Sequence, residues 1–316
     1  MPPMIKTIAA QLGLLSLAML GGAIRAEAEL AVVATIKPVH ALVAQVMGAT
    51  GTPELLVGGT ASPHTFSIKP SDAKRLARAT LVFRVAETVE PFTAKLVGVL
   101  PKGATLVTLS TAPGIAALPR RRGGPFEADA HNGHDHDHDD HAPKGGMDGH
   151  VWLDPANGAA MLDAIAAALS AKAPENAAVY GANAAAAKAR LDVLAKEIAA
   201  ELAPVAGKSF VIFHDATQYF EKRFGLTVAG SITTDPDVPA SGKRLSALRA
   251  KIARTGAACV FSEPNFEAKV VAAVIEGSAA RTAVLDPEGA TLQPGPDLYE
   301  NLLRGMAKSI KGCLVP

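Results

Sequence analysis

The chain has 316 residues, of which 49% are hydrophobic and 19% are charged, and its formal net charge is +1. Such a balanced charge offers no electrostatic footprint for a nucleic-acid backbone, and the apolar share is high enough for a packed core. The length predicts two domains, because a single hydrophobic core stops growing at roughly 250–300 residues.

The first 28 residues have the layout of a secretory signal peptide. Lys6 gives a short positive start, an apolar stretch covers residues 8–20, and an A-x-A cleavage site ends at Ala28. The apolar stretch is shorter than the roughly 20 residues that span a bilayer. Cleavage would leave a chain with as many basic as acidic residues and no nearby cysteine for a lipid anchor. We expect a periplasmic protein without stable membrane insertion.

Short apolar runs alternate with amphipathic segments in the first part of the chain. Strands are predicted at 31–36, 53–57, 80–85 and 105–110, and helices at 38–48, 71–79 and 90–100. This alternation is typical of a parallel sheet with helices on its faces.

Residues 119–149 interrupt the pattern with a segment rich in Gly, Pro, Asp and His, which predicts a mobile insertion. Its five histidines alternate with aspartates and are His131, His134, His136, His138 and His141. Imidazole and carboxylate groups together suit Zn²⁺, so we interpret the loop as an auxiliary, multi-ion zinc collector; the alternative is a soluble linker. Residues 136–141 also match the H-x-H-x-D-H motif of zinc hydrolases. That motif should close an apolar strand, and none precedes it here.

A long helix is predicted in the middle of the chain. A first helix covers about 155–170, and Pro174 and Pro204 then bound an alanine-rich helical segment. At 1.5 Å per residue this segment would reach about 45 Å, longer than a small domain is wide. We therefore predict an N-terminal lobe (29–173), a linking helix (174–204) and a C-terminal lobe (205–316).

Alternation resumes in the C-terminal lobe. Strands are predicted at 208–213, 226–230, 258–262 and 282–285, with helices at 215–224, 242–255, 266–276 and 297–311. The predicted fold class is α/β: two lobes, each a parallel sheet flanked by helices, joined by a long rigid helix.

The two cysteines of the chain, Cys259 and Cys313, both lie in its last quarter. In an oxidising compartment such a pair predicts a disulfide, and closing a loop of this length should contribute roughly 4 kcal/mol in the chain-entropy model. The alternative, a pair of zinc thiolates, would need further ligands nearby.

Three histidines outside the insertion lie where ligands gather in α/β proteins. His214 directly follows a predicted strand, His64 lies in a Gly/Ser/Pro loop after another, and His150 ends the insertion. Asp286 also follows a strand. Ligands bind outside the carboxyl ends of strands in open α/β sheets, and three imidazoles with one carboxylate complete a tetrahedral zinc site. His40, at the start of the first helix, is interpreted as structural.

Four segments of the chain resemble those of a known family. They read ASPHTFSIKPSDAKRL (61–76), GHVWLDP (149–155), FHDATQYFEKRFGL (213–226) and CVFSEPNF (259–266). In their order they look like the periplasmic zinc-binding proteins that serve high-affinity zinc ABC transporters. The resemblance implies a monomeric solute-binding protein that captures Zn²⁺ between its lobes and delivers it to a membrane permease. It also implies that His64, His150 and His214 bind zinc, and that Cys259 pairs with Cys313.

The resemblance gives alternatives for the fourth ligand. Some zinc-binding members use a Glu immediately before the first His, where this chain has Pro63, which leaves Asp286 or a water molecule. Manganese-binding relatives carry a Glu at the position of His214, so the histidine favours zinc. Three imidazole ligands also predict that binding weakens as the pH falls from 7 towards 5.

Three other functions stay open from the residues. One is manganese binding within the same family. Another is a secreted zinc hydrolase, in which Glu263 after a predicted strand would be the nearest carboxylate, although Glu263 could equally be structural or a partner of a ligand histidine. A third is an adhesin that also binds metal. The preferred prediction is a binding protein that is not an enzyme.

Overall fold

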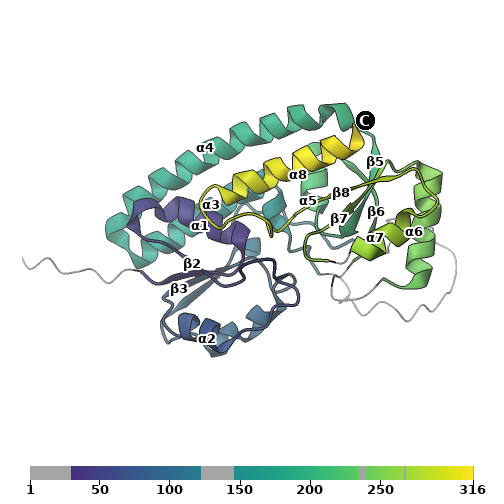
Figure 1. The fold of residues 1–316 in the computed structure, drawn as a ribbon. Helices are drawn as coiled ribbons and strands as arrows, with labels where there is room; N and C mark the ends of the chain where they lie inside the picture. The colour runs from purple at the N-terminus through teal and green to yellow at the C-terminus, as the bar shows by residue number, and fades with distance from the viewer. Residues whose placement is uncertain (1–29, 122–145, 235, 237–239, 267, 316) are drawn as a thin grey trace, which may run out of the picture.

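The computed structural model describes residues 30–121, 146–234, 236, 240–266 and 268–315. The N-terminal lobe contains a four-stranded parallel sheet in the order β2-β1-β3-β4; β2 and β3 are labelled in Figure 1. Its strands are β1 (Val32–Ala34), β2 (Glu54–Leu55), β3 (Leu81–Arg84) and β4 (Thr105–Thr108). Every residue of β1 is buried, as expected for a strand covered on both faces. The predicted signal peptide and the five loop histidines lie outside the described residues.

The helices of this lobe follow the predicted positions with one change of type. They are α1 (Lys37–Met47), α2 (Pro70–Leu76) and α3 (Pro155–Lys172). Pro91–Gly98, predicted as part of an ordinary helix, instead forms a 3₁₀ helix. Helix α3 begins where Asp154 accepts a hydrogen bond from the Ala156 N–H and Pro155 occupies the first turn.

The C-terminal lobe repeats the arrangement. Its parallel sheet has the order β6-β5-β7-β8, with β5 (Ser209–His214), β6 (Thr227–Thr233), β7 (Cys259–Ser262) and β8 (Arg281–Val284). Its helices are α5 (Gln218–Phe224), α6 (Gly242–Thr255) and α7 (Ala268–Ile275). Helix α5 ends at Gly225, which takes the left-handed conformation that stops a helix. The predicted α/β fold class, with two parallel sheets flanked by helices, is confirmed.

Long helices join the two lobes. Helix α4 (Ala177–Leu202) is continued at its two ends by the 3₁₀ turns Pro174–Asn176 and Ala203–Val205, as the two prolines predicted. Helix α8 (Leu298–Leu314) lies beside it and packs against both α4 and α1 (Figure 1). The last helix in sequence therefore also contacts the N-terminal lobe. The residue bounds of the lobes stay a prediction.

One hydrophobic core runs from the first sheet to the second. It includes Phe83 of β3, Leu42 of α1, Leu191 of α4, Leu303 of α8 and Phe261 of β7, all at most 1% exposed. Because side chains of both sheets pack on the same helices, the lobes share apolar contacts that would be lost if they separated.

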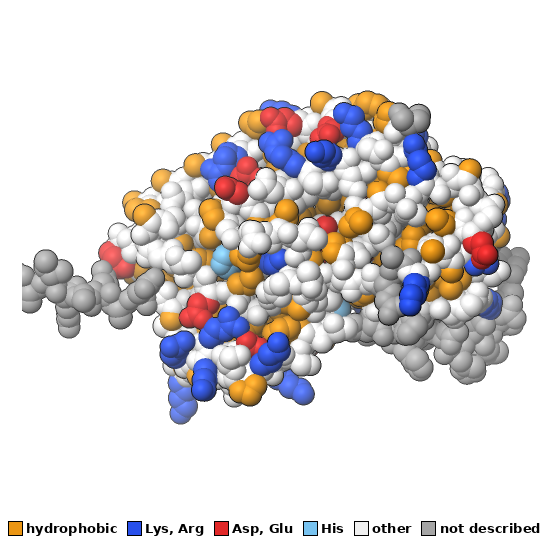
Figure 2. All heavy atoms as spheres, in the orientation of Figure 1, with side chains coloured by type: hydrophobic (Ala, Val, Ile, Leu, Met, Phe, Trp, Pro, Cys, Tyr) orange, Lys and Arg blue, Asp and Glu red, His pale blue; other side chains and the backbone are white. Residues whose placement is uncertain are grey.

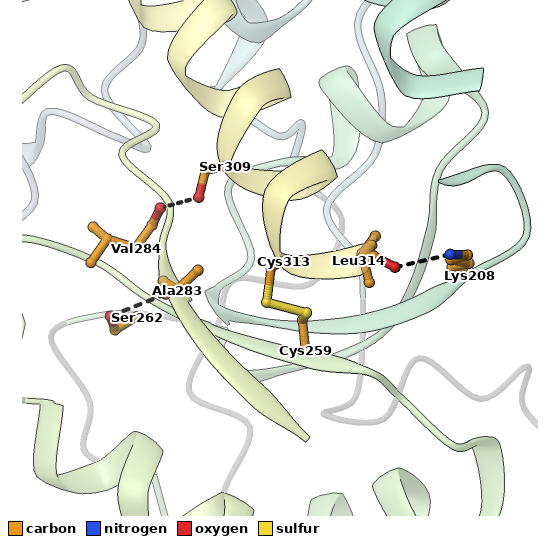
Figure 3. The surroundings of a disulfide bond; sticks show 8 residues. All are labelled: Lys208, Cys259, Ser262, Ala283, Val284, Ser309, Cys313 and Leu314. Atoms are coloured by element: carbon orange, nitrogen blue, oxygen red, sulfur yellow. Dashed lines mark hydrogen bonds between the residues drawn. A yellow bond between two sulfur atoms is a disulfide. The ribbon is translucent and has the colours of Figure 1, made fainter. Parts of the chain in front are cut away.

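The predicted disulfide between Cys259 and Cys313 is confirmed (Figure 3). It joins the start of β7 to the last turn of α8. Beside it, the Lys208 ammonium donates to the Leu314 carbonyl at 2.9 Å and ties the same end of α8 to the residue before β5. The C-terminal helix is thus fixed to the second sheet at two adjacent points.

The charged surface is mixed in sign. Figure 2 shows acidic and basic side chains interspersed on the upper side of the molecule and basic ones gathered at the tip of the N-terminal lobe. Exposed Lys69, Lys74 and Arg78 lie on and next to α2. Over the part of the chain that the structure describes, no helix is long and apolar enough to cross a membrane.

Candidate metal centre

Three chain segments bring His64, His150 and His214 together between the lobes. His64 lies in the loop between β2 and α2, His150 directly precedes the turn Val151–Leu153 that leads into α3, and His214 is the last residue of β5. All three imidazoles are buried. Among the described residues they are the one group of His, Cys, Asp and Glu side chains arranged to hold a metal ion, with their ligand atoms all within 4.8 Å of one another.

The spacing of the ring nitrogens suits a tetrahedral zinc ion. The Nε2 atom of His150 is 3.4 Å from Nε2 of His64 and 3.4 Å from Nε2 of His214. At Zn–N distances of about 2.0–2.1 Å, a tetrahedral angle places two ligand nitrogens about 3.3–3.4 Å apart. Ring centroids are separated by 5.4, 5.4 and 5.3 Å, so the rings surround one point rather than stack.

Carboxylates hold two of these rings by their other nitrogen. Nδ1 of His214 is 2.7 Å from Glu263 Oε1, and Nδ1 of His150 is 2.7 Å from Asp148 Oδ1. Each contact favours the tautomer with a proton on Nδ1 and a free lone pair on Nε2, the arrangement found in carboxylate–histidine–zinc sites. The interpretation of Glu263 as a partner of a histidine agrees with this contact, whereas Asp148 was not singled out from the sequence.

Burial shifts the pKa values of the cluster in different directions. Desolvation, followed by repulsion from the other imidazoles, holds the pKa of His64 well below its usual 6.5, and burial does the same to His150. Burial also opposes protonation of His214, but the charge and hydrogen bond of Glu263 outweigh it and raise this pKa to about 9. At neutral pH the rings of His64 and His150 therefore have free lone pairs for a metal ion, whereas the ring of His214 carries an additional proton.

Two carboxylates follow β8, and they differ in their contacts. Asp286, the predicted fourth ligand, accepts hydrogen bonds from the Ala290 N–H at 2.8 Å, and from the Thr291 N–H and hydroxyl at 3.0 and 2.9 Å. Glu288, which sequence reasoning missed, is buried with Oε1 4.0 Å from Nε2 of His64. Desolvation raises the Glu288 pKa to about 8. Asp286 as a zinc ligand stays a prediction.

The base of the His/Asp-rich insertion is anchored beside the cluster. Arg121 forms ion pairs with Asp215, next to His214, and with Glu221 of α5. Tyr219 of α5 accepts from the Leu118 N–H and donates to the Asp148 carbonyl, bonds of 2.9 and 2.7 Å that hold both ends of the insertion. The partner carboxylate of His150 therefore belongs to this anchored base.

His40 stays apart from this centre. Its ring Nε2 lies 3.0 Å from the Pro53 carbonyl oxygen and links α1 to the residue before β2. The contact agrees with the structural interpretation of this histidine.

The fold and the cluster together define a two-lobed, helix-linked metal-binding protein. Residues 32–313 match the family described as zinc-uptake complex component A, periplasmic. The chain is 45% identical over 309 residues to the high-affinity zinc uptake system protein ZnuA of Brucella abortus, which covers 90% of this chain and 91% of the relative. It is 40% identical to the protein of the same name from Paracoccus denitrificans, over 90% and 91% of the two chains.

A solved structure described as the crystal structure of ZnuA has the same fold, with a TM-score of 0.73 and 22% identity over 90% of this chain and 98% of the other. The chain belongs to the ZnuA family of periplasmic zinc-uptake components. Members of this family are solute-binding proteins, so this chain is a binding protein and not an enzyme.

Proposed function

We propose that this protein captures Zn²⁺ at His64, His150 and His214 and delivers it to the permease of an ABC transporter. The observation that carries the proposal is the convergence of three buried imidazoles from three segments, with nitrogens 3.4 Å apart in two pairs. Neutral imidazoles are the nitrogen ligands that zinc prefers, and the carboxylate partners of His150 and His214 orient the rings before the ion arrives.

Zinc is favoured over manganese by the ligand type. Manganese prefers oxygen donors, and three imidazoles form a nitrogen-dominated site. Substitution of His214 by Glu should lower the affinity for zinc relative to that for manganese, because it replaces a nitrogen donor by an oxygen donor. If the wild type and His214→Glu had the same ratio of zinc affinity to manganese affinity, His214 would not determine the preference for zinc.

We further propose the surroundings in which this capture takes place. Residues 1–28 act as a cleaved signal peptide, and the mature protein works in the periplasm as a monomer. Its partner is the membrane permease that accepts the ion. The loop histidines His131, His134, His136, His138 and His141 collect zinc weakly and raise its concentration near the centre. Family membership supports the periplasmic location and the permease partner. The ion pair of Arg121 with Asp215, next to His214, supports a position of the loop beside the centre.

The experiment is a zinc competition titration with a chelating dye on the full mature protein. The variants His64→Ala, His150→Ala and His214→Ala should each lose the tight binding event. His40→Ala is the control, since it removes another buried imidazole that lies outside the cluster, and this variant should keep the tight binding event. Equal losses in His40→Ala and His214→Ala, with both variants folded by circular dichroism, would overturn the site.

A further inference from the structure

We propose that Glu288 is the fourth protein ligand of the zinc ion and that Asp286 shapes the turn that presents it. This inference rests on the proposed function, because it needs a metal ion at the three histidines. It assigns the oxygen donor to Glu288, whereas the sequence predicted Asp286 because that residue directly follows a strand.

The contacts of the two Glu288 oxygens differ, as those of a ligand carboxylate should. Oε2 accepts a hydrogen bond of 2.8 Å from the Asn265 amide, which fixes the side chain. Oε1 is buried without a hydrogen-bond partner among the described residues and lies 4.0 Å from Nε2 of His64. A buried carboxylate oxygen without a partner is costly. A zinc ion bound by His64 would lie next to Oε1 and supply that partner.

Asp286 is already committed to the backbone. Both of its oxygens accept hydrogen bonds within the turn of residues 286–291. Rotating the carboxylate towards the histidines would leave the N–H of buried Ala290 without its acceptor, which costs roughly 1–3 kcal/mol. Asp286 therefore stabilises the turn in which Glu288 lies.

Two side chains of the N-terminal lobe hold this turn in place. The Lys37 ammonium, from the first turn of α1, donates to the carbonyl oxygens of Gly289, Ala290 and Leu292 at 3.2, 2.7 and 2.9 Å. The Trp152 indole, two residues after the ligand His150, donates to the Pro287 carbonyl at 2.9 Å. Glu288 is thus carried by a segment fixed next to the cluster, as a ligand with well-defined geometry requires.

Charge also favours an anionic ligand at this position. Three neutral imidazoles bring no negative charge into direct contact with the ion, and buried charge without close compensation is strongly unfavourable. Asp148 lies behind His150 and contacts the ring only. Glu263 lies behind His214 and contacts the ring rather than the ion. A carboxylate in direct contact with the ion compensates its charge at the shortest distance, where the interaction is strongest.

The test compares Glu288→Gln with Asp286→Asn in the full mature protein. Both substitutions keep the shape of the side chain and remove its ability to become a carboxylate, and Glu175→Gln, on the exposed turn before α4, is the matched surface control. Zinc affinity is measured by competition with a chelating dye, the coordination by the visible spectrum of the Co²⁺-loaded protein, and apo stability by thermal unfolding.

We expect Glu288→Gln to weaken zinc binding at least tenfold and to change the Co²⁺ spectrum, with apo stability unchanged or raised. Asp286→Asn should chiefly lower the melting temperature of the apo protein and leave the Co²⁺ spectrum unchanged. Wild-type affinity and spectrum in Glu288→Gln, or a spectrum altered only by Asp286→Asn, would overturn the assignment. The variants His64→Ala, His150→Ala and His214→Ala test the proposed function independently. If they lose zinc while Glu288→Gln behaves as the wild type, the proposed function stands and only the assignment of Glu288 fails.

Discussion

Glu263→Gln should change how zinc affinity depends on pH more than it changes affinity at pH 7. Glu263 lies 2.7 Å from Nδ1 of His214 and raises the pKa of that ring to about 9, against the opposing effect of burial. Below pH 9 the apo ring therefore carries a proton that zinc must displace. The glutamine keeps an oxygen that can accept from Nδ1 but removes the charge, so burial should bring the His214 pKa below that of the wild type.

The magnitude follows from the two protonation states. A group with a pKa of about 9 is protonated roughly 100-fold over its neutral form at pH 7, so loss of the His214 proton alone should raise wild-type affinity roughly 100-fold from pH 7 to above pH 9. In Glu263→Gln the proton competes much less with zinc for His214. The variant also loses the charged partner that orients the His214 ring, which costs about 10–100-fold in metal affinity. The two effects offset each other at pH 7, and the variant should be clearly weaker only above pH 9.

The assay is chelator-buffered zinc titration from pH 6.5 to 9.5 on both proteins. Glu288, whose pKa burial raises to about 8, adds proton competition to both, so the difference between their slopes isolates His214. Calorimetry in buffers of different ionisation enthalpy should show about one more proton released by the wild type at pH 7.5. Parallel pH profiles for the two proteins would refute the role given to the Glu263 contact.

Two further outcomes are expected. Deletion of residues 122–145 should leave one tight binding event in a calorimetric zinc titration. Deletion of residues 120–148 should weaken that event, because the longer deletion also removes Asp148, the partner of His150. Loss of the event in the shorter deletion would place the main site in the loop. Replacing Cys259 and Cys313 together by serine should lower the free energy of unfolding by roughly 4 kcal/mol in denaturant titrations. The zinc affinity of this variant should stay within a few-fold of the wild type, since the disulfide joins β7 to α8 away from the histidines. An unchanged unfolding midpoint would contradict the stabilising role of the disulfide.

The fold could be predicted to a large extent because its signals are local. Apolar runs marked the strands, and Pro174 and Pro204 bounded the long helix within a turn of its ends. Sequence could not show that α8 packs against α1 and α4, because that packing depends on the relative placement of two lobes. The 3₁₀ form of Pro91–Gly98 was also missed, since short 3₁₀ and α segments share nearly the same apolar spacing.

Local signals place the candidate ligand at the end of a strand, but they do not distinguish the two carboxylates in the turn after β8. His214 ends β5, so its place at the sheet edge followed from the strand itself. Asp286 and Glu288 are two residues apart in one turn, and hydrogen bonds to Ala290 and Thr291 determine which of them is free. Asp148 lies two residues before His150, but only the folded segment shows that its oxygen reaches that ring.

The contacts around the centre indicate how little the lobes can move. Arg121, Lys37 and Trp152, all from the N-terminal part of the chain, contact Asp215 and the turn after β8 in the C-terminal lobe. Helix α4 contains no proline at which it could kink, and the core that it shares with α8 is continuous across both lobes. Opening the lobes as rigid bodies would break polar and apolar contacts together. We therefore expect release of the ion to begin in the loop between β2 and α2 that carries His64, because residues 58–61 of this loop are exposed, whereas His150 directly precedes Trp152 and its neighbours in the shared core.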